Sequence, residues 1–462
     1  PPVRDLRFAA PEQPEPWDGV RPATTFGTPP PQSSTVSPGA PETTGDDWLT
    51  CNVWSPDLGA AHLPVMVWIY GGAYLIGHSG DPVYSGARLA RDGGVVVVTF
   101  NHRVAMEGFG QIEGAPANRG LLDQVAALTW VRDNIAAFGG DPGDVTVFGE
   151  SAGAGSIAAL LAMPRAAGLF QKAIAQSVPG TYFSRALADD IGATIAAEAG
   201  ARPVRDELAA VAPARLMKAV DAIVTTMGPR QRWGQVAHSA TPFSPVVDGD
   251  VLPRTPWDAL TDGSARDIAL ITGHNRDEYR LFTAMDGLHG QVTEEQSATA
   301  LRTFAPDPDA FRRAFPDASA EYLHELVQSD WLFRMPSLHL AEAHTAGGGR
   351  AHLYELTWQA PGLGGILGAC HTLDIPLVFG NLAGGIADLV IGEDRAAAAE
   401  LSAEIRSAWT GFATSGDPGW PVYEAAQRLT RVYDTVSSVL PYPEETSRAL
   451  WAGHTFSELP LL

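Results

Sequence analysis

The pentapeptide Gly149-Glu150-Ser151-Ala152-Gly153 places a serine between two glycines. This G-x-S-x-G spacing is typical of a nucleophile elbow, a sharp strand-to-helix turn that exposes the serine hydroxyl. Glycines suit the turn because side chains at those positions would collide with neighbouring backbone. A serine exposed in this way can attack a carbonyl carbon and form an acyl-enzyme. The pattern predicts Ser151 as a nucleophile, and its alternative is a glycine-rich turn without a catalytic role.

The residues around the pentapeptide fit the predicted turn. Residues 145–148 form an apolar run of strand length, and the small residues of 154–163 favour a helix. A helix that begins behind Ser151 would also favour negative charge that develops near its N-terminus.

A second glycine-rich segment, residues 68–74, follows an apolar run that predicts a buried strand. Backbone N–H groups in such a turn, with that of the residue after the nucleophile, can bind the oxyanion of a tetrahedral intermediate. Glycine lets the backbone approach the substrate with no side chain in the way. The predicted oxyanion hole consists of Gly72, Ala73 and Ala152.

The alternation of apolar runs and amphipathic segments predicts an α/β fold. Runs at 65–70 and 95–100 are typical of strands buried on both faces of a mostly parallel sheet. Apolar residues recur at three- and four-residue spacing through 120–139, which predicts a helix. Residues 141–144 are expected to form a turn. Later strands are expected at 268–272 and 353–356, and a last long helix at 396–412.

With the elbow, this order predicts an α/β-hydrolase fold, a large and mostly parallel central sheet flanked by helices. We expect one domain over residues 1–462, with helical insertions over the active site at about 179–264 and 285–345. The Pro-rich first fifty residues are interpreted as a surface loop.

The charge balance excludes one class of partner. The 462 residues include 53 acidic and 31 basic ones, for a formal net charge of −22. Such a field repels polyanions, so nucleic-acid binding is excluded and neutral or cationic substrates are favoured.

Two cysteines, Cys51 and Cys370, are too few for a disulfide framework and lack metal-ligand spacing. No apolar run reaches the roughly 18 residues that a membrane span needs, and no signal peptide is recognisable. We expect no cofactor, no metal and a cytoplasmic location. The chain opens abruptly at Pro1, so we expect that residues before it are missing, and secretion stays an alternative location. The sequence leaves the oligomeric state open.

The chain resembles the type B carboxylesterases, the group that contains cholinesterases and bacterial para-nitrobenzyl esterases. The resemblance covers essentially the whole length. It is carried by residues 68–74, 118–124, 138–142, 145–153, 168–170 and 176–177.

The resemblance implies a Ser-Glu-His triad formed by Ser151, Glu278 and His371. The acid lies in an Asp-Glu pair after a strand, and the histidine precedes a Pro-x-x-Phe-Gly segment that begins at Pro376. From the residues alone, Asp277 and Glu278 stay near even, and the resemblance favours Glu278. The other histidine candidates are His102, His274 and His289. A histidine base predicts activity that rises with pH around about 6.5, or higher beside a carboxylate.

Two departures from the family pattern weaken the interpretation of this chain as a cholinesterase. Trp48 stands where the family's eukaryotic members usually have a cysteine, and residues 32–47 contain no aromatic residue. We expect an esterase for neutral, apolar esters, whose partner is a small-molecule ester. The alternative is a catalytically silent adhesion module, and among enzymes a lipase, thioesterase or carbamate hydrolase stays open. The pocket walls are expected to come from the insertion and from loops around Phe282, Trp331, Phe333 and residues 363–367. The alternative for these aromatic residues, which is the commoner one, is a place in the core.

Overall fold

A nine-stranded sheet runs through the centre of the computed structural model, which describes residues 2–33, 35–36, 41–393 and 395–462. The strand order is β1-β3-β2-β4-β5-β8-β9-β10-β11, and pairing is parallel except for β1 with β3 and β10 with β11. The strands are β1 (Cys51–Trp54), β2 (Leu63–Ile69), β3 (Val96–Phe100), β4 (Gly140–Glu150), β5 (Lys172–Gln176), β8 (Ala269–Asn275), β9 (Arg350–Leu356), β10 (Leu429–Tyr433) and β11 (Ser438–Pro441).

Side chains alternate between the two faces of this sheet, and both faces are buried. In β2, Val65, Val67 and Ile69 belong to one apolar cluster, whereas Met66 and Trp68 belong to the other. A parallel sheet needs such cover on both faces, which explains the continuous apolar runs. The predicted α/β-hydrolase sheet is confirmed.

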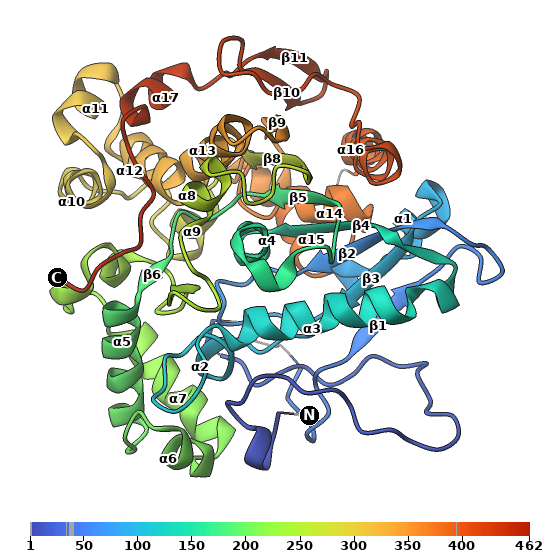
Figure 1. Ribbon diagram of the computed structural model, residues 1–462. Helices are drawn as coiled ribbons and strands as arrows, with labels where there is room; N and C mark the ends of the chain where they lie inside the picture. The colour runs from blue at the N-terminus through green and yellow to red at the C-terminus, as the bar shows by residue number, and fades with distance from the viewer. Residues whose placement is uncertain (1, 34, 37–40, 394) are drawn as a thin grey trace.

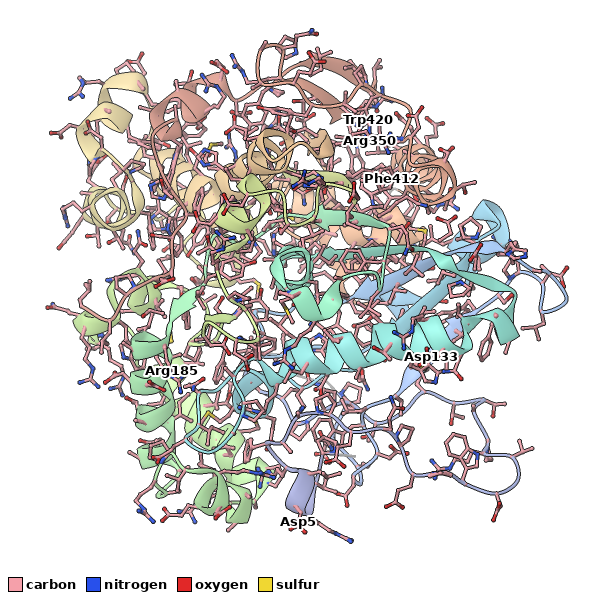
Figure 2. All side chains as sticks on the ribbon, in the orientation of Figure 1. Asp5, Asp133, Arg185, Arg350, Phe412 and Trp420 are labelled. Carbon is pink, nitrogen blue, oxygen red and sulfur yellow. The ribbon has the colours of Figure 1, made fainter. Side chains whose placement is uncertain are left out.

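Helices supply the cover on each face (Figure 1). The first cluster contains residues of α3 (Arg119–Asn134), α4 (Ala152–Ala162), α8 (Pro256–Thr261) and α13 (Met335–Ala346). The second cluster contains residues of α1 (Ala87–Gly93), α14 (Asp374–Phe379) and α16 (Ala396–Ser415). Figure 2 shows side chains filling the space between these layers, with Phe412 and Trp420 of the second cluster labelled near α16. Apart from the helices of the two predicted insertions, the short helices are α2 (Ala105–Gly108), α9 (Arg280–Met285), α15 (Ile386–Val390), α17 (Glu445–Trp451), η1 (Arg4–Leu6), η2 (Pro82–Tyr84), η3 (Ile135–Phe138), η4 (Pro164–Ala166) and η7 (Gly362–Gly365).

The structure corrects the expectation of a separate turn at 141–144. These residues lie inside β4, which begins at Gly140, and the register of the β4–β2 pairing shifts beside them. The N–H of Gly143 still donates to the Asp141 carboxylate at 2.8 Å, as in a turn. The turn residues therefore form an irregularity within a longer strand.

The two predicted insertions contain mostly helices. The first holds α5 (Arg185–Glu198), α6 (Arg205–Ala210), α7 (Pro213–Val224), η5 (Gln231–His238) and α8, with the short pair β6 (Phe183–Ser184) and β7 (Val246–Val247). The second holds α10 (Glu294–Phe304), α11 (Pro308–Ala314), α12 (Ala320–Ser329), a π-helix η6 (Asp330–Arg334) and most of α13. Their status as insertions within one domain stays a prediction.

The surface loop expected in the first fifty residues is exposed over residues 12–26, but Phe8 is fully buried in the core. Pro1 and residues 34 and 37–40 of this segment lie outside the described residues. In the described part of the chain, no helix combines the length and the apolar character that a membrane crossing requires.

A buried ion pair joins the segment after β3 to α3. Arg103 donates to Asp123 through Nε at 2.8 Å, through a terminal nitrogen at 2.7 Å and through its backbone N–H at 2.9 Å. Asp123→Asn leaves the Arg103 charge buried without its counter-ion, so we expect a loss of about 3–5 kcal/mol of unfolding free energy. Urea unfolding followed by tryptophan fluorescence measures this loss.

The control is Asp133→Asn on the same helix, where Figure 2 labels Asp133. Asp133 forms an exposed ion pair with Arg132. This variant should keep the urea midpoint of the parent. Equal midpoints for the two variants would contradict the role given to the buried pair.

Candidate active site

Ser151 lies between β4 and α4 in a strained backbone conformation, with φ 56° and ψ −126°. A side chain at Gly149 would place its Cβ 2.6 Å from the Ile69 carbonyl oxygen, and one at Gly153 would place it 2.0 Å from that oxygen. Both glycines of the motif are therefore required by the close approach of β2. The turn matches the nucleophile elbow expected from the sequence.

The imidazole of His371 connects the serine to a carboxylate. Its Nε2 lies 2.9 Å from Ser151 Oγ, and its Nδ1 lies 2.6 Å from Glu278 Oε2. His371 and Glu278 are both buried. The three residues singled out from the sequence thus form a continuous hydrogen-bonded chain.

Glu278 receives two further hydrogen bonds, which orient its carboxylate. Its Oε1 accepts from the backbone N–H of Asn275 at 2.8 Å and from Ser177 Oγ at 2.5 Å. Such donors stabilise a buried carboxylate in its charged form. A charged carboxylate at Nδ1 would hold the imidazole in the tautomer whose Nε2 accepts a proton.

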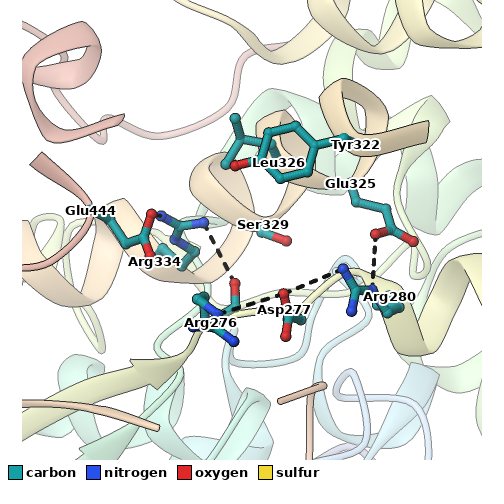
Figure 3. Close-up of a pocket in the computed structure, with 9 residues that line it drawn as sticks. All are labelled: Arg276, Asp277, Arg280, Tyr322, Glu325, Leu326, Ser329, Arg334 and Glu444. Atoms are coloured by element: carbon teal, nitrogen blue, oxygen red, sulfur yellow. Dashed lines mark hydrogen bonds and ion pairs between the residues drawn. The ribbon is translucent and has the colours of Figure 1, made fainter. Parts of the chain in front are cut away.

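Asp277, the rival acid, points into a different cavity (Figure 3). There it lies 3.4 Å from a terminal nitrogen of Arg280, and its Oδ2 accepts from the Ala369 N–H at 3.0 Å. Arg276 also lines this cavity beside it. Neighbouring carboxylates therefore face opposite sides of the turn, and it is Glu278 that contacts the imidazole.

The other candidate histidines lie elsewhere. His102 stacks on Tyr70 with ring centroids 4.3 Å apart, and burial lowers its pKa to about 4. His274 Nε2 lies 2.9 Å from the Tyr442 hydroxyl oxygen. These contacts give both side chains a structural place in the core.

The third candidate, His289, lies in a group of potential metal ligands with Glu321 and Glu325. Its Nδ1 is 3.1 Å from Glu321 Oε1. Arg280 Nε donates to Glu325 at 3.1 Å, so a guanidinium already balances part of this negative charge. We interpret the group as an ion-pair network.

The predicted oxyanion-hole residues lie beside the elbow. Ala73 and Ala152 line the same cavity as Ser151, and a Cβ at Gly71 would lie 3.1 Å from the Ser151 Cβ. Ala152 is the first residue of α4, where backbone N–H groups have no partner within the helix. Within the described residues, the N–H groups of Gly72 and Ala73 donate to no other protein group. These N–H groups are available to a ligand.

Glu150 is a site residue that sequence reasoning missed. Its Oε1 lies 3.2 Å from His371 Nε2, and the side chain is almost fully buried. Burial raises the pKa of Glu150 to about 8, although His371 opposes the rise. The only sequence signal was an acidic residue beside the nucleophile, and nothing in the spacing indicates which way that residue points.

Opposing effects act on His371. Burial alone would lower the pKa of its imidazole, but the carboxylates of Glu150 and Glu278 more than compensate and raise it above the ordinary 6.5. The charged forms of His371 and Glu150 therefore stabilise each other.

The cavity in front of Ser151 is largely apolar. Phe282 and Phe333 line it, as expected, and so does Leu332, the residue before Phe333. Phe333 stacks on the His371 ring with centroids 4.1 Å apart. Trp331 itself packs on Phe304, the core alternative, although Leu332 and Phe333 beside it line the cavity. Residues 363–367 are not among the lining residues, so that expectation is corrected. The other lining residues are Ala73, Tyr74, Ala152, Pro179, Thr181, Phe183, Ser239, Ala240, Thr241 and Phe243.

Comparisons with known proteins agree with this geometry. The model of the carboxylesterase family matches residues 1–440. A para-nitrobenzyl esterase of Bacillus subtilis is 38% identical over 97% of this chain and 92% of its own, and a pig (Sus scrofa) liver carboxylesterase is 31% identical over 94% and 83%.

Solved structures give the same result. A para-nitrobenzyl esterase structure superposes with a TM-score of 0.85 at 36% identity, covering 97% of this chain and 93% of that one. A Geobacillus stearothermophilus carboxylesterase also reaches 0.85 at 36% identity, covering 97% and 94%. The chain belongs to the carboxylesterase family and is a serine hydrolase that cleaves carboxylic esters.

Proposed function

We propose that Ser151 is the nucleophile, His371 the general base and acid, and Glu278 the residue that orients His371. The observation that carries this proposal is the pair of contacts at His371, 2.9 Å to Ser151 Oγ and 2.6 Å to Glu278 Oε2. Distances of this size allow proton transfer in the transition state without movement of the backbone.

In the first half of the reaction, the Ser151 oxygen attacks the ester carbonyl while its proton passes to His371 Nε2. The carbon–oxygen bond to the alcohol then breaks, and the imidazolium returns the proton to the leaving alkoxide. In the second half, water attacks the acyl-enzyme by the same proton route and releases the acid. Glu278 stabilises the imidazolium in both halves.

The negative charge of the tetrahedral intermediate develops on the former carbonyl oxygen. We assign its stabilisation to the N–H groups of Gly72, Ala73 and Ala152, which donate to no acceptor among the residues that the structure describes. Donors that are fixed before the reaction need no reorganisation when charge appears.

The substrate class that fits this cavity best is a neutral, apolar ester. Phe183, Phe243, Phe282 and Phe333 contribute apolar surface to its walls. The formal net charge of −22 disfavours anionic esters.

We also propose a cytoplasmic location, which the free thiols of Cys51 and Cys370 support.

Replacement of the nucleophile tests the assignment directly. Ser151→Ala removes the attacking oxygen, so kcat for nitrophenyl acetate should fall by about 10⁴-fold or more. The exposed Ser415→Ala is the control and should hydrolyse the ester at the parent rate. Near-parent turnover by a folded Ser151→Ala protein would refute the assignment.

A second prediction concerns the carboxylate of Glu150. Activity requires neutral His371, so kcat/KM should rise with pH as the imidazole loses its proton. The charged form of Glu150 raises the pKa of His371. Glu150→Gln removes this effect, and the acidic limb of the kcat/KM profile should move to lower pH. A limb that stays in place or moves to higher pH would show that Glu150 does not act on His371.

A further inference from the structure

The oxyanion segment has an unusual backbone. Gly72, Ala73 and Tyr74 follow one another with φ values of 101°, 57° and 57°. Two of these residues carry a Cβ, and left-handed conformations are unfavourable for such residues. The conformation therefore persists only if surrounding groups hold it.

The first insertion supplies one such group. Thr241 Oγ1 donates to the Ala73 carbonyl oxygen at 2.8 Å, a contact between residues 168 positions apart in sequence. The nearest alternative acceptor, the Phe243 carbonyl oxygen, is at 3.5 Å. The neighbouring Tyr74 carbonyl accepts from the Ala105 N–H at 2.6 Å. Both carbonyls of the non-glycine pair are thus anchored from outside the segment.

The Thr241 hydroxyl is itself oriented by its neighbours. Its oxygen accepts from the Phe243 N–H at 3.1 Å, so its own proton is directed to another acceptor. Ser239 Oγ lies 2.9 Å from the Val236 carbonyl oxygen and 3.0 Å from the Thr241 carbonyl oxygen, and its single proton is shared between these two acceptors of the same loop. Thr241 and Ala73 both line the cavity that contains Ser151. The contact lies at the edge of the reacting centre.

We propose that Thr241 is a positioning residue of the oxyanion hole, which holds the Ala73 backbone in the left-handed conformation. The proposal rests on the function proposed above for Gly72 and Ala73. If the Ala73 carbonyl lost its donor, the backbone at Ala73 would relax out of its left-handed conformation and move the N–H groups of Gly72 and Ala73 away from the oxyanion. The helical insertion would thereby control transition-state binding as well as the shape of the cavity.

The test compares Thr241→Val with Thr241→Ser. Valine keeps the branched shape and lacks the hydroxyl, whereas serine keeps the hydroxyl. Direct loss of an oxyanion donor costs about 10²- to 10³-fold in kcat, and Thr241 acts one step away, so Thr241→Val should lower kcat by about tenfold. KM for nitrophenyl acetate should stay within about twofold, because ground-state contacts are kept. Thr241→Ser should restore kcat to near the parent value.

A tetrahedral analogue separates this role from a structural one. A trifluoromethyl ketone forms a hemiketal oxyanion with the serine, so its affinity should fall with kcat in Thr241→Val and recover in Thr241→Ser. The exposed Thr225→Val is the control for loss of a threonine hydroxyl and should match the parent. If Thr241→Val does not fold, Thr241→Ala provides the same comparison.

Three results would overturn the proposal. These are a parent-like kcat and ketone affinity in Thr241→Val, a raised KM with unchanged kcat, or equal losses in the valine and serine variants. Ser151→Ala, measured in parallel, distinguishes the two levels of the argument. An active Ser151→Ala would refute the proposed function itself, whereas an inactive one beside a parent-like Thr241→Val would refute only the role of Thr241.

Discussion

The hydrogen bond between Glu278 and His371 is the interaction on which the rest of the site depends. A carboxylate that is buried away from solvent is stable only if hydrogen-bond donors surround it. Here the donors are the Asn275 N–H at the end of β8, the Ser177 hydroxyl just after β5, and the His371 imidazole. These groups meet because the carboxyl ends of neighbouring parallel strands lie at one edge of the sheet. The same edge carries Ser151 at the end of β4.

The close contact between β2 and the elbow sets the second requirement. The Ile69 carbonyl leaves no room for a side chain at Gly149 or Gly153, and this proximity also brings the segment after β2 next to Ser151. One packing arrangement therefore brings together the proposed nucleophile and the proposed oxyanion donors. The segment 285–345 adds Phe333, whose ring stacks on the imidazole of His371.

The sequence was sufficient for those parts of the fold and site that local pattern determines. Continuous apolar runs located β2 and β3, and the glycine spacing located Ser151. The choice between Asp277 and Glu278 needed the family resemblance, because adjacent residues of a turn differ only in direction. The contact of Glu278 with His371 agrees with that choice.

Other features depend on contacts between distant segments and left no local signal. Thr241 reaches Ala73 across 168 positions, and nothing in either segment indicates the other. The residue types of 141–144 predict a separate turn, but the sequence does not show that these residues also pair with β2. In the structure they form a turn-like hydrogen bond within a paired strand. The sequence does not indicate which residues around Trp331 face the pocket or the core. In the π-helix that contains them, Leu332 and Phe333 line the cavity, whereas Trp331 packs on Phe304.

The central claim is that Glu278 orients the base, and a matched pair of substitutions tests it most directly. Glu278→Gln keeps the shape and removes the charge, so kcat for nitrophenyl acetate should fall by about 10³-fold or more. Asp277→Asn makes the same chemical change one residue away, on the opposite side of the turn, and should change kcat by less than about threefold. Thermal unfolding of both proteins confirms that each is folded at the assay temperature. A large loss in Asp277→Asn with near-parent activity in Glu278→Gln would contradict the account.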